Sequence, residues 1–514
     1  MSNSRTDNAI KNILYGYIGT ILTTVMSFIV RTVFIYGIGT TFLGISGLFS
    51  NILGMLSFTE LGIGTAMNFS LYKPIAENDI EKVKSLMKLY KSAYRLIAIV
   101  ILIIGLSILP FLTFFVKGAE NIESLRLYYL IFLFNSVSSY FITYKYGLIN
   151  AEQKGYVLTN INTFFTIIMN IIQIIFILAF KNYLLYLLTQ AIIQLVQKVY
   201  TNIYINKFHP YLNDKNIHEI PLMEKKNIYK NVKALMVHKL GEISVYQTDN
   251  IITSAFINVK LVGLVSNYSL VVQTINTFTN IILNGVSSSL GNLIALENKN
   301  RQLEIFNIYR FCGFWINCIL SVCLVTLFQP FIRIWIGTEN IIEYSVVLLL
   351  ILNNYLMIER LLINNLKTSA GIFQQDQYIA LLQGIMNIII SVILAKNLGL
   401  VGIYLGTVLS GLIPTLLRPY IVYKNMFSLK IKSYYKDFLL YLIFTFSFCL
   451  IYYTLLDKFL ISANLVVWIL IGFIEFLTLN IILYLIFKKN NKFIYIKNII
   501  FNKLHNNIKE RKIK

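Results

Sequence analysis

The chain has 514 residues, of which 57% are hydrophobic and only 13% are charged, and its mean hydropathy is +0.67. Because soluble domains carry roughly 25% charged residues, this composition is typical of a polytopic membrane protein. The formal net charge of +22 does not indicate a nucleic-acid partner, since lysine and arginine cluster between alternate apolar runs in the positive-inside pattern.

Apolar runs between polar breaks predict about fourteen membrane-spanning helices, since a span needs about 20 apolar residues. Tight turns at Lys181-Asn182 and Lys396-Asn397 join neighbouring spans, so about twelve to fourteen spans is the expected range. The predicted fold class is an all-α polytopic membrane protein. The predicted spans are residues 10–36, 42–72, 93–116, 124–149, 157–180, 183–206, 233–257, 260–292, 305–329, 341–366, 378–396, 400–423, 435–455 and 463–487.

Positive charge alternates between the predicted loops. One set is rich in lysine and arginine, from Lys73 through residues 207–230 to the tail at 488–514, whereas the opposite set is poor in both. The positive-inside rule therefore places both termini in the cytoplasm and requires an even number of spans. The N-terminal segment has no cleavage site and runs into a span of about 25 residues, so we expect the first helix to be retained.

Residues 78–94 have an amphipathic helical pattern, with lysines around an apolar stripe. Two interpretations are open: a helix that lies on an anionic inner leaflet, or ordinary positive-inside anchoring. The stripe comprises Ile80, Val83, Met87, Tyr90 and Tyr94.

Several catalytic and metal-binding motifs are missing from the sequence. It has no P-loop, no G-x-G-x-x-G that enters a helix and no H-E-x-x-H, and its four cysteines lack metal-ligand spacing. The predicted outer loops are no longer than about 15 residues, which disfavours a membrane glycosyltransferase or polymerase. We therefore expect a protein that is not an enzyme, binds no metal and needs no cofactor.

The segment 238–256 carries a polar stripe inside a long apolar run. Steps of three and four residues place its members on one helix face. A carboxylate at membrane depth costs at least ~3 kcal/mol, so these groups need partners or water. Either an ion pair of Lys239 with Glu242 only fixes helix packing, or the stripe lines a polar pathway. The stripe comprises Lys239, Glu242, Tyr246, Asp249 and Thr253.

Two further charges lie in the first two predicted spans. Arg31 either extends to the outer interface or serves as a cavity cation for an anionic substrate, because guanidinium binds phosphate bidentately and stays charged. Glu60, midway along the second span, is either protonated or paired, for example with Arg31. Such a group is either a proton or cation site or a purely structural partner.

Polar residues also recur in the later spans. Asn280 and Asn284 belong to a four-residue repeat that either binds neighbouring helices or lines a cavity, where amides suit sugar hydroxyls. Arg360 and Arg418 lie toward the predicted cytoplasmic ends of their spans, and an interfacial position is favoured for Arg418.

Four stretches of the sequence follow the pattern of one family. The first begins RTVFIYGIGTTFLGISGLFS at Arg31, and the others read TDNIITSAFINVKLVGLVSNYSLV, SLGNLIALEN and LGLVGIYLGTVLSGL. From about residue 10 to 425 the chain resembles the Wzx-like oligosaccharide flippases of Gram-positive bacteria, which transport polysaccharide repeat units. Their superfamily includes multidrug and toxin extruders and lipid II flippases. Arg31 stands near a first-helix arginine of the lipid II flippases, but the acidic residue that follows it there is Thr32 here.

The resemblance implies two six-helix bundles that face each other, with two additional C-terminal helices. A faint internal repeat agrees with duplicated halves, a transporter plan in which the site lies between the repeats. The repeat matches Gly44, Phe49 and Ser50 in the second span with Gly263, Tyr268 and Ser269 in the eighth. The implied domains are an N-terminal bundle at 1–206, a cytoplasmic linker at 207–232, a C-terminal bundle at 233–425, two additional helices at 426–488 and a basic cytoplasmic tail at 489–514.

The function that the resemblance implies is a flippase in the bacterial plasma membrane. It would move undecaprenyl-pyrophosphate-linked oligosaccharide from the inner to the outer leaflet, for capsule, exopolysaccharide or wall polymer. Two negative charges that move outward across ~100 mV release roughly 4–5 kcal/mol, so the membrane potential is a candidate driving force beside a proton or sodium gradient. The expected cavity cations are Arg31, Lys239 and Arg360. The expected sugar contacts are Tyr246, Asn280 and Asn284, and the expected coupling carboxylates are Glu60, Glu242 and Asp249.

Three competing functions stay open. A multidrug extruder of the same fold needs an acidic, aromatic cavity for amphiphilic cations. A membrane glycan polymerase needs catalytic residues in its outer loops, and a non-transporting scaffold would use the polar stripe for packing only. Beside the lipid-linked oligosaccharide, the partners expected of a flippase are membrane lipid and the polysaccharide polymerase and chain-length machinery.

Overall fold

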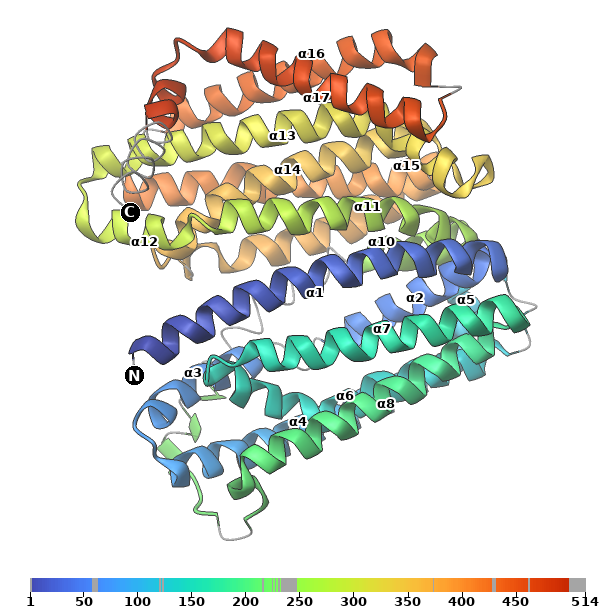
Figure 1. The fold of residues 1–514 in the computed structure, drawn as a ribbon, viewed down its shortest axis with the longest axis vertical. Helices are drawn as coiled ribbons and strands as arrows, with labels where there is room; N and C mark the ends of the chain where they lie inside the picture. Colours follow the sequence, from blue (N-terminus) through green and yellow to red (C-terminus); the bar gives the residue numbers. More distant parts are fainter. Residues whose placement is uncertain are drawn as a thin grey trace, which may run out of the picture. The chain divides into compact units, whose positions relative to one another are not determined.

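The computed structural model is all-α, as the sequence predicts (Figure 1). It describes residues 2–57, 63–119, 122, 124–214, 217–223, 225–226, 228–229, 232, 247–372, 374–427, 431–460 and 463–498. Within these residues, nine helices are long and apolar enough to cross a membrane. The chain is therefore a polytopic membrane protein built from helices.

Every predicted span overlaps at least one helix of the structure, and the longest helix, α15, covers two spans. The N-terminal helices are α1 (Ser2–Gly37), α2 (Thr40–Leu56), α3 (Ile63–Ala76), α4 (Ile80–Ile108), α5 (Leu112–Phe115), α6 (Leu125–Ala151), α7 (Gly155–Phe180), α8 (Tyr183–Phe208) and α10 (Thr248–Phe256). The later helices are α11 (Val259–Asn284), α12 (Ser287–Leu296), α13 (Lys299–Ile336), α14 (Tyr344–Ser369), α15 (Gln377–Met426), α16 (Ile431–Leu460) and α17 (Leu465–Phe487). Short 3₁₀ turns are η2 (Leu109–Phe111), η3 (Pro210–Asn213), η4 (Thr338–Asn340) and η5 (Gln374–Asp376).

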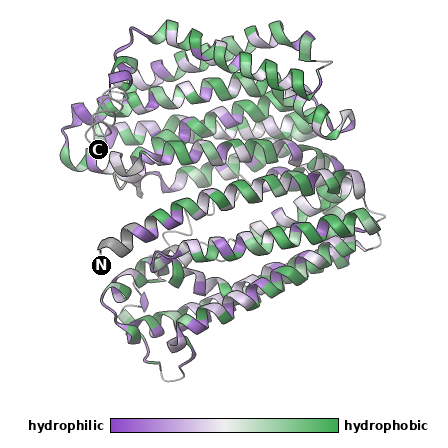
Figure 2. Cartoon of the chain, viewed as in Figure 1, coloured by the Kyte–Doolittle hydropathy of each residue, from purple (hydrophilic) through white to green (hydrophobic). Residues whose placement is uncertain are grey.

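Helix packing divides the chain into two compact units, Met1–Ser266 (unit 1) and Asn267–Lys514 (unit 2). In unit 1, α1 packs along α7, and α6 packs against α3, α4 and α8. In unit 2, α13 packs against α14, α16 and α17, and α14 packs against α12 and α15. Hydrophobic residues cover most of the helix length in both units (Figure 2). The finer domain boundaries that the family resemblance implies stay a prediction.

Two turns join neighbouring spans as helical hairpins. After α7, Lys181 takes a left-handed conformation with φ of 45°, and Asn182 caps α8 by accepting a hydrogen bond from the backbone N–H of Leu185 at 3.2 Å. The second turn lies two residues beyond its predicted position, because α15 continues as a helix and breaks at Gly399, with φ of 56° and ψ of −132°. Glycine adopts this conformation without the clash that a Cβ would cause.

Helices α2 and α11 touch at Gly44 and Gly263, both in unit 1. A Cβ at Gly44 would overlap the carbonyl oxygen of Val259, and one at Gly263 would overlap the carbonyl oxygen of Thr40. The two glycines are equivalent in the internal repeat, and so are Thr40 and Val259, four residues before them. The contact is therefore symmetric, and it requires residues without side chains at its centre.

The first half of α4 is not a separate surface helix. It continues into the apolar span, and Asp79 caps it by accepting from the backbone N–H of Lys82 at 2.9 Å. Most of the predicted apolar stripe packs inside unit 1, where α4 contacts α3 and α6. Its members Val83, Met87, Tyr90 and Tyr94 are at most 4% exposed, and only Ile80 is open, at 51%. The interpretation that this stripe lies on the inner leaflet is therefore wrong.

A hydrogen-bonded cluster ties the connection after α8 to the end of α6. The imidazole of His209 binds Glu152 Oε1 at 2.7 Å, and Lys154 Nζ donates to Glu152 Oε2 at 2.9 Å. Burial raises the pKa of Glu152, but the hydrogen bonds from His209 and Lys154 outweigh burial, so the pKa lies below the ordinary value of 4.5. The carboxylate is thus stabilised in its charged form.

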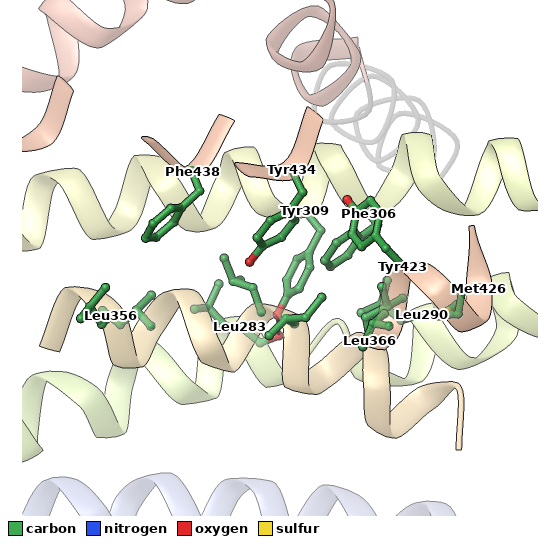
Figure 3. Packing of buried hydrophobic residues seen from close by; sticks show 14 of the residues in the cluster. Leu283, Leu290, Phe306, Tyr309, Leu356, Leu366, Tyr423, Met426, Tyr434 and Phe438 are labelled. Atoms are coloured by element: carbon green, nitrogen blue, oxygen red, sulfur yellow. Dashed lines mark hydrogen bonds between the residues drawn. The ribbon is translucent and has the colours of Figure 1, made fainter. Parts of the chain in front are cut away.

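The core of unit 2 is an apolar cluster where α13, α14, α15 and α16 meet (Figure 3). Tyr309 lies within it, and its hydroxyl donates to the carbonyl of Leu283 at 3.0 Å and accepts from Asn365 Nδ2 at 2.9 Å. The rings of Tyr423 and Tyr434 meet edge to face, with centroids 5.4 Å apart. These contacts hold α15 and α16 against the rest of the unit.

Candidate functional site

A cavity of about 320 Å³ lies inside unit 1 around Arg31. Residues of α1, α2, α6, α7 and α8 and the first part of α11 line it. Arg31 Nη1 donates to the hydroxyl of Ser266 at 2.8 Å. The guanidinium thus lies in the helix bundle, where a ligand in the cavity can reach it.

The other polar groups that line this cavity are neutral hydroxyls and amides. Ser46 shares a hydrogen bond of 2.7 Å with the hydroxyl of Tyr183. Among the described lining residues, none is aspartate or glutamate. A cation surrounded by hydroxyls and amides suits an anionic ligand with sugar hydroxyls, whereas an amphiphilic cation would find no counter-charge among the described lining residues. The neutral polar lining residues are Ser27, Ser46, Ser50, Asn170, Tyr186, Gln190 and Ser266.

Arg31 is alone among the predicted site residues in the lining of this cavity. Asp249 lies in the first turn of α10, which packs against α2 and α5, and its backbone carbonyl accepts from the hydroxyl of Thr253 at 2.7 Å. Four predicted residues lie outside the part of the chain that the structure describes, so their roles stay predictions: Glu60, Lys239, Glu242 and Tyr246.

The remaining predicted residues belong to unit 2. Asn280 is exposed on α11, and the amide oxygen of Asn284 accepts from Asn365 Nδ2 at 3.0 Å. Arg360 is 8% exposed between α14 and α15, and its Nη1 donates to the carbonyl of Gly411 at 3.4 Å. The contacts of Asn284 and Arg360 join neighbouring helices of unit 2.

Two lysines between α6 and α8 escaped the sequence reasoning. Lys145 is 4% exposed, and its Nζ donates to the side-chain oxygens of two asparagines of α8 at 2.6 and 2.5 Å. Lys198 Nζ donates to the hydroxyl of Ser138 at 2.8 Å and to a backbone carbonyl of α6 at 2.9 Å. Both lysines lie inside predicted spans, and that position alone marks an ionisable residue as a functional candidate.

A buried ion pair that the sequence reasoning also missed joins α13 to α14. Arg310 and Glu359 are both 2% exposed, with Arg310 Nη2 4.0 Å from Glu359 Oε2. The guanidinium carbon of Arg310 lies 3.6 Å from the ring centroid of Tyr434, a close cation–π contact. Glu359 directly precedes Arg360 in the sequence, but its ion pair with Arg310 is made across the interface of two helices.

A second buried group, the Asp376 cluster, lies near the end of α14. Asp376 Oδ2 is 2.6 Å from Lys367 Nζ and 3.3 Å from Arg418 Nε. Arg418 is only 8% exposed, so its side chain is buried within unit 2, and its interfacial depth stays a prediction. In α17, Glu475 is 1% exposed and accepts from the hydroxyl of Thr326 at 2.8 Å. Within the described residues, no group of three histidine, cysteine or acidic side chains could hold a metal ion.

No family model and no curated protein matches the chain, but solved structures share its fold. The lipid II flippase MurJ, in an inward closed conformation, matches with a TM-score of 0.62 at 16% identity, over 92% of this chain and 99% of that chain. An inward-facing multidrug resistance MATE transporter of the MOP superfamily matches with a TM-score of 0.59 at 14% identity, over 80% and 96%. A MOP superfamily transporter from Pyrococcus furiosus, described as having a binding pocket of reverse polarity, matches with a TM-score of 0.54 at 13% identity, over 81% and 96%. The chain therefore has the fold of the MOP superfamily transporters.

Proposed function

We propose that this protein is a flippase that moves undecaprenyl-pyrophosphate-linked oligosaccharide from the inner to the outer leaflet of the bacterial plasma membrane. The observation that carries the proposal is the Arg31 cavity, whose described lining holds a cation, hydroxyls and amides and no carboxylate. The guanidinium of Arg31 would bind pyrophosphate oxygens, and Asn170 and Gln190 would bind sugar hydroxyls. The fold shared with the lipid II flippase MurJ supports a lipid-linked substrate.

The size of the cavity fits one part of such a substrate. Ligand pockets range from about 300 to 1,000 Å³, so the 320 Å³ enclosed by unit 1 holds a pyrophosphate or a single sugar. The polyprenyl tail stays in the bilayer in this mechanism, and only the polar head group crosses.

The proposal includes a driving force and an orientation. With both termini in the cytoplasm, outward movement of two negative charges follows the membrane potential and releases roughly 4–5 kcal/mol per 100 mV. Coupling to a proton or sodium gradient would act through the carboxylates Glu60, Glu242 and Asp249.

A second candidate function is export of amphiphilic cations. The observation that favours it is the fold, which MATE multidrug transporters also have. The Arg31 cavity is the argument against it, because a cationic drug would have to approach a permanent positive charge without a described carboxylate beside it.

The decisive experiment uses a deletion strain in which the leaflet position of lipid-linked repeat units is measured. The strain carries the wild type, Arg31→Ala, Arg31→Lys or the control Arg126→Ala, which removes an exposed arginine of unit 1, all at matched membrane levels. A charge-assisted hydrogen bond contributes ~1.5–3 kcal/mol, so Arg31→Ala should flip at least about tenfold more slowly. Arg31→Lys should be intermediate, because an ammonium keeps the charge and loses the bidentate geometry.

The outcomes separate the two functions. The flippase is supported if complete repeat units accumulate on the inner leaflet in the deletion strain and in the strain that carries Arg31→Ala. The wild type and Arg126→Ala should both remove this accumulation. Normal flipping with Arg31→Ala refutes the role of the cavity. No accumulation in the deletion strain, together with increased sensitivity to cationic dyes, indicates the drug extruder.

A further inference from the structure

A second cavity in unit 1, of about 400 Å³, lies between α4, α6 and the connection after α8. Four cations of α4, spaced by four, three and four residues, fall on one helix face that lines it. The wall opposite α4 includes Tyr144 of α6 and Asn213 of η3. The four cations are Lys84, Lys88, Lys91 and Arg95.

The connection that closes this cavity is tied to α4 by polar contacts. Lys84 Nζ lies 3.1 Å from Asp214 Oδ2, and the hydroxyl of Ser85 donates to the carbonyl of His218 at 2.7 Å. The Glu152–His209 hydrogen bond fixes the same connection to α6. These contacts hold the described residues of the connection against α4 and α6, so they hold that wall of the cavity in the folded unit.

Among the described residues, three of the four cations have no ion-pair partner. Asp214 is the one carboxylate in the described lining, and Lys84 engages it. The side chains of Lys88, Lys91 and Arg95 are exposed and form no ion pair with any described residue. Like charges three and four residues apart on a helix repel one another, so an anion in the cavity would relieve that repulsion.

The position of the cavity along α4 indicates which anion it meets. Directly after Arg95, α4 presents large hydrophobic side chains to the outside, with Leu96 63%, Ile99 54% and Ile103 62% exposed. A lipid-facing surface that begins one residue beyond the cationic stripe places the stripe at the level of the lipid head groups.

We propose that this cavity binds a phosphate-bearing group, a lipid phosphodiester or pyrophosphate, at the end of unit 1 predicted to be cytoplasmic. Arg95 binds phosphate oxygens in its planar fork, Lys88 and Lys91 contribute point charges, and Ser92 and Asn213 line the same space as neutral donors. The site is separate from the Arg31 cavity, since the two share no lining residue. The proposal therefore does not depend on the transported substrate.

The test measures binding to the purified full-length protein in detergent, by microscale thermophoresis at two salt concentrations. The probes are phosphatidylglycerol, farnesyl pyrophosphate, inorganic pyrophosphate and the net-neutral phosphatidylcholine. The variant Lys88→Gln/Lys91→Gln/Arg95→Gln removes the unpaired cations. The matched control, Lys181→Gln/Lys207→Gln/Lys260→Gln, removes the same charge from exposed lysines outside the cavity.

We expect the triple variant to bind phosphatidylglycerol and farnesyl pyrophosphate at least tenfold more weakly than the wild type, and the control to change by less than twofold. If the triple variant does not fold, Lys91→Gln and Arg95→Gln alone should each weaken binding severalfold, and Lys91→Arg should retain it. If inorganic pyrophosphate also binds, the phosphate group alone is sufficient for binding. If only phosphatidylglycerol and farnesyl pyrophosphate bind, the hydrocarbon chain of the lipid also contributes. Equal affinities of the triple variant and the control, or binding of inorganic pyrophosphate without either lipid, would overturn the proposal.

Discussion

The change Glu359→Leu would leave Arg310 in the core of unit 2 without the carboxylate that faces it at 4.0 Å. Loss of one partner of a buried pair costs ~3–5 kcal/mol, because the remaining charge is uncompensated. Arg310 cannot lose its charge by deprotonation, since arginine stays protonated in proteins. The ring of Tyr434, 3.6 Å from the guanidinium, still stabilises the cation, so we expect a loss near the lower limit, ~3 kcal/mol.

Removal of both charges should cost much less than removal of the carboxylate alone. Apolar side chains of similar size often replace a buried ion pair without loss of stability, so Arg310→Met/Glu359→Leu should lie within ~1 kcal/mol of the wild type. The assay is equilibrium unfolding in mixed micelles, followed by tryptophan fluorescence. All three tryptophans, Trp315, Trp335 and Trp468, lie in unit 2, so the signal reports on the unit that contains the pair.

The comparison of the two single variants with the double variant also tests whether the ion pair of Arg310 and Glu359 only stabilises the fold. Under the proposed function, the double variant should flip substrate at the wild-type rate once membrane levels are matched, because neither charge lines the cavity of unit 1. Two results would refute the reasoning: Glu359→Leu as stable as the wild type, or a double variant whose loss equals the sum of the two single losses.

Two further changes test the packing and the ionisation of unit 1. Gly44→Val should lower the yield of monodisperse protein severalfold, because the new side chain would overlap the carbonyl of Val259. Overpacking of this kind costs ~1–3 kcal/mol. The control is Gly16→Val, since no atom lies within 4 Å of a Cβ at Gly16. Because the pKa of Glu152 is lowered in the folded state, its carboxylate stabilises the protein fully above the ordinary pKa of 4.5, and this stabilisation is lost as pH falls through the folded-state pKa. The melting temperature of Glu152→Gln should therefore fall less steeply with decreasing pH than that of the wild type. Equal slopes for the two proteins would contradict the stabilising role of the hydrogen bond between Glu152 and His209.

The sequence was sufficient to predict the fold class because lipid imposes a simple rule: spans must be long, apolar and helical. The turn at Lys181-Asn182 was predictable for the same reason, since two polar residues between apolar runs leave no other place for the chain to reverse. The sequence left two interpretations of the stripe of residues 80–94 open, because an apolar face looks alike whether it packs on lipid or on protein. Its burial depends on α3 and α6, which no local pattern reveals.

The candidate site was predictable only in part. A charged residue inside a predicted span is a strong signal, and it singled out Arg31, which does line a cavity. The same signal was present at Lys145, Arg310 and Glu475 and was overlooked. The ion pairs themselves could not be predicted from the sequence. Glu359 lies beside Arg360 in the sequence but faces Arg310, which belongs to a different helix and lies 49 residues earlier in the chain.

The two units differ in the partners of the ionisable side chains that lie within their helices. In unit 2, a carboxylate faces Arg310, and the Asp376 cluster also joins opposite charges. In unit 1, Lys145 and Lys198 contact only neutral oxygens among the described residues, and no described carboxylate lines the Arg31 cavity. Lys145 is 4% exposed, and a buried cation without a carboxylate costs stability, so its retention argues for a use that an internal ion pair would cancel. Under the proposed function, we infer that unit 1 binds the anionic head group of the substrate.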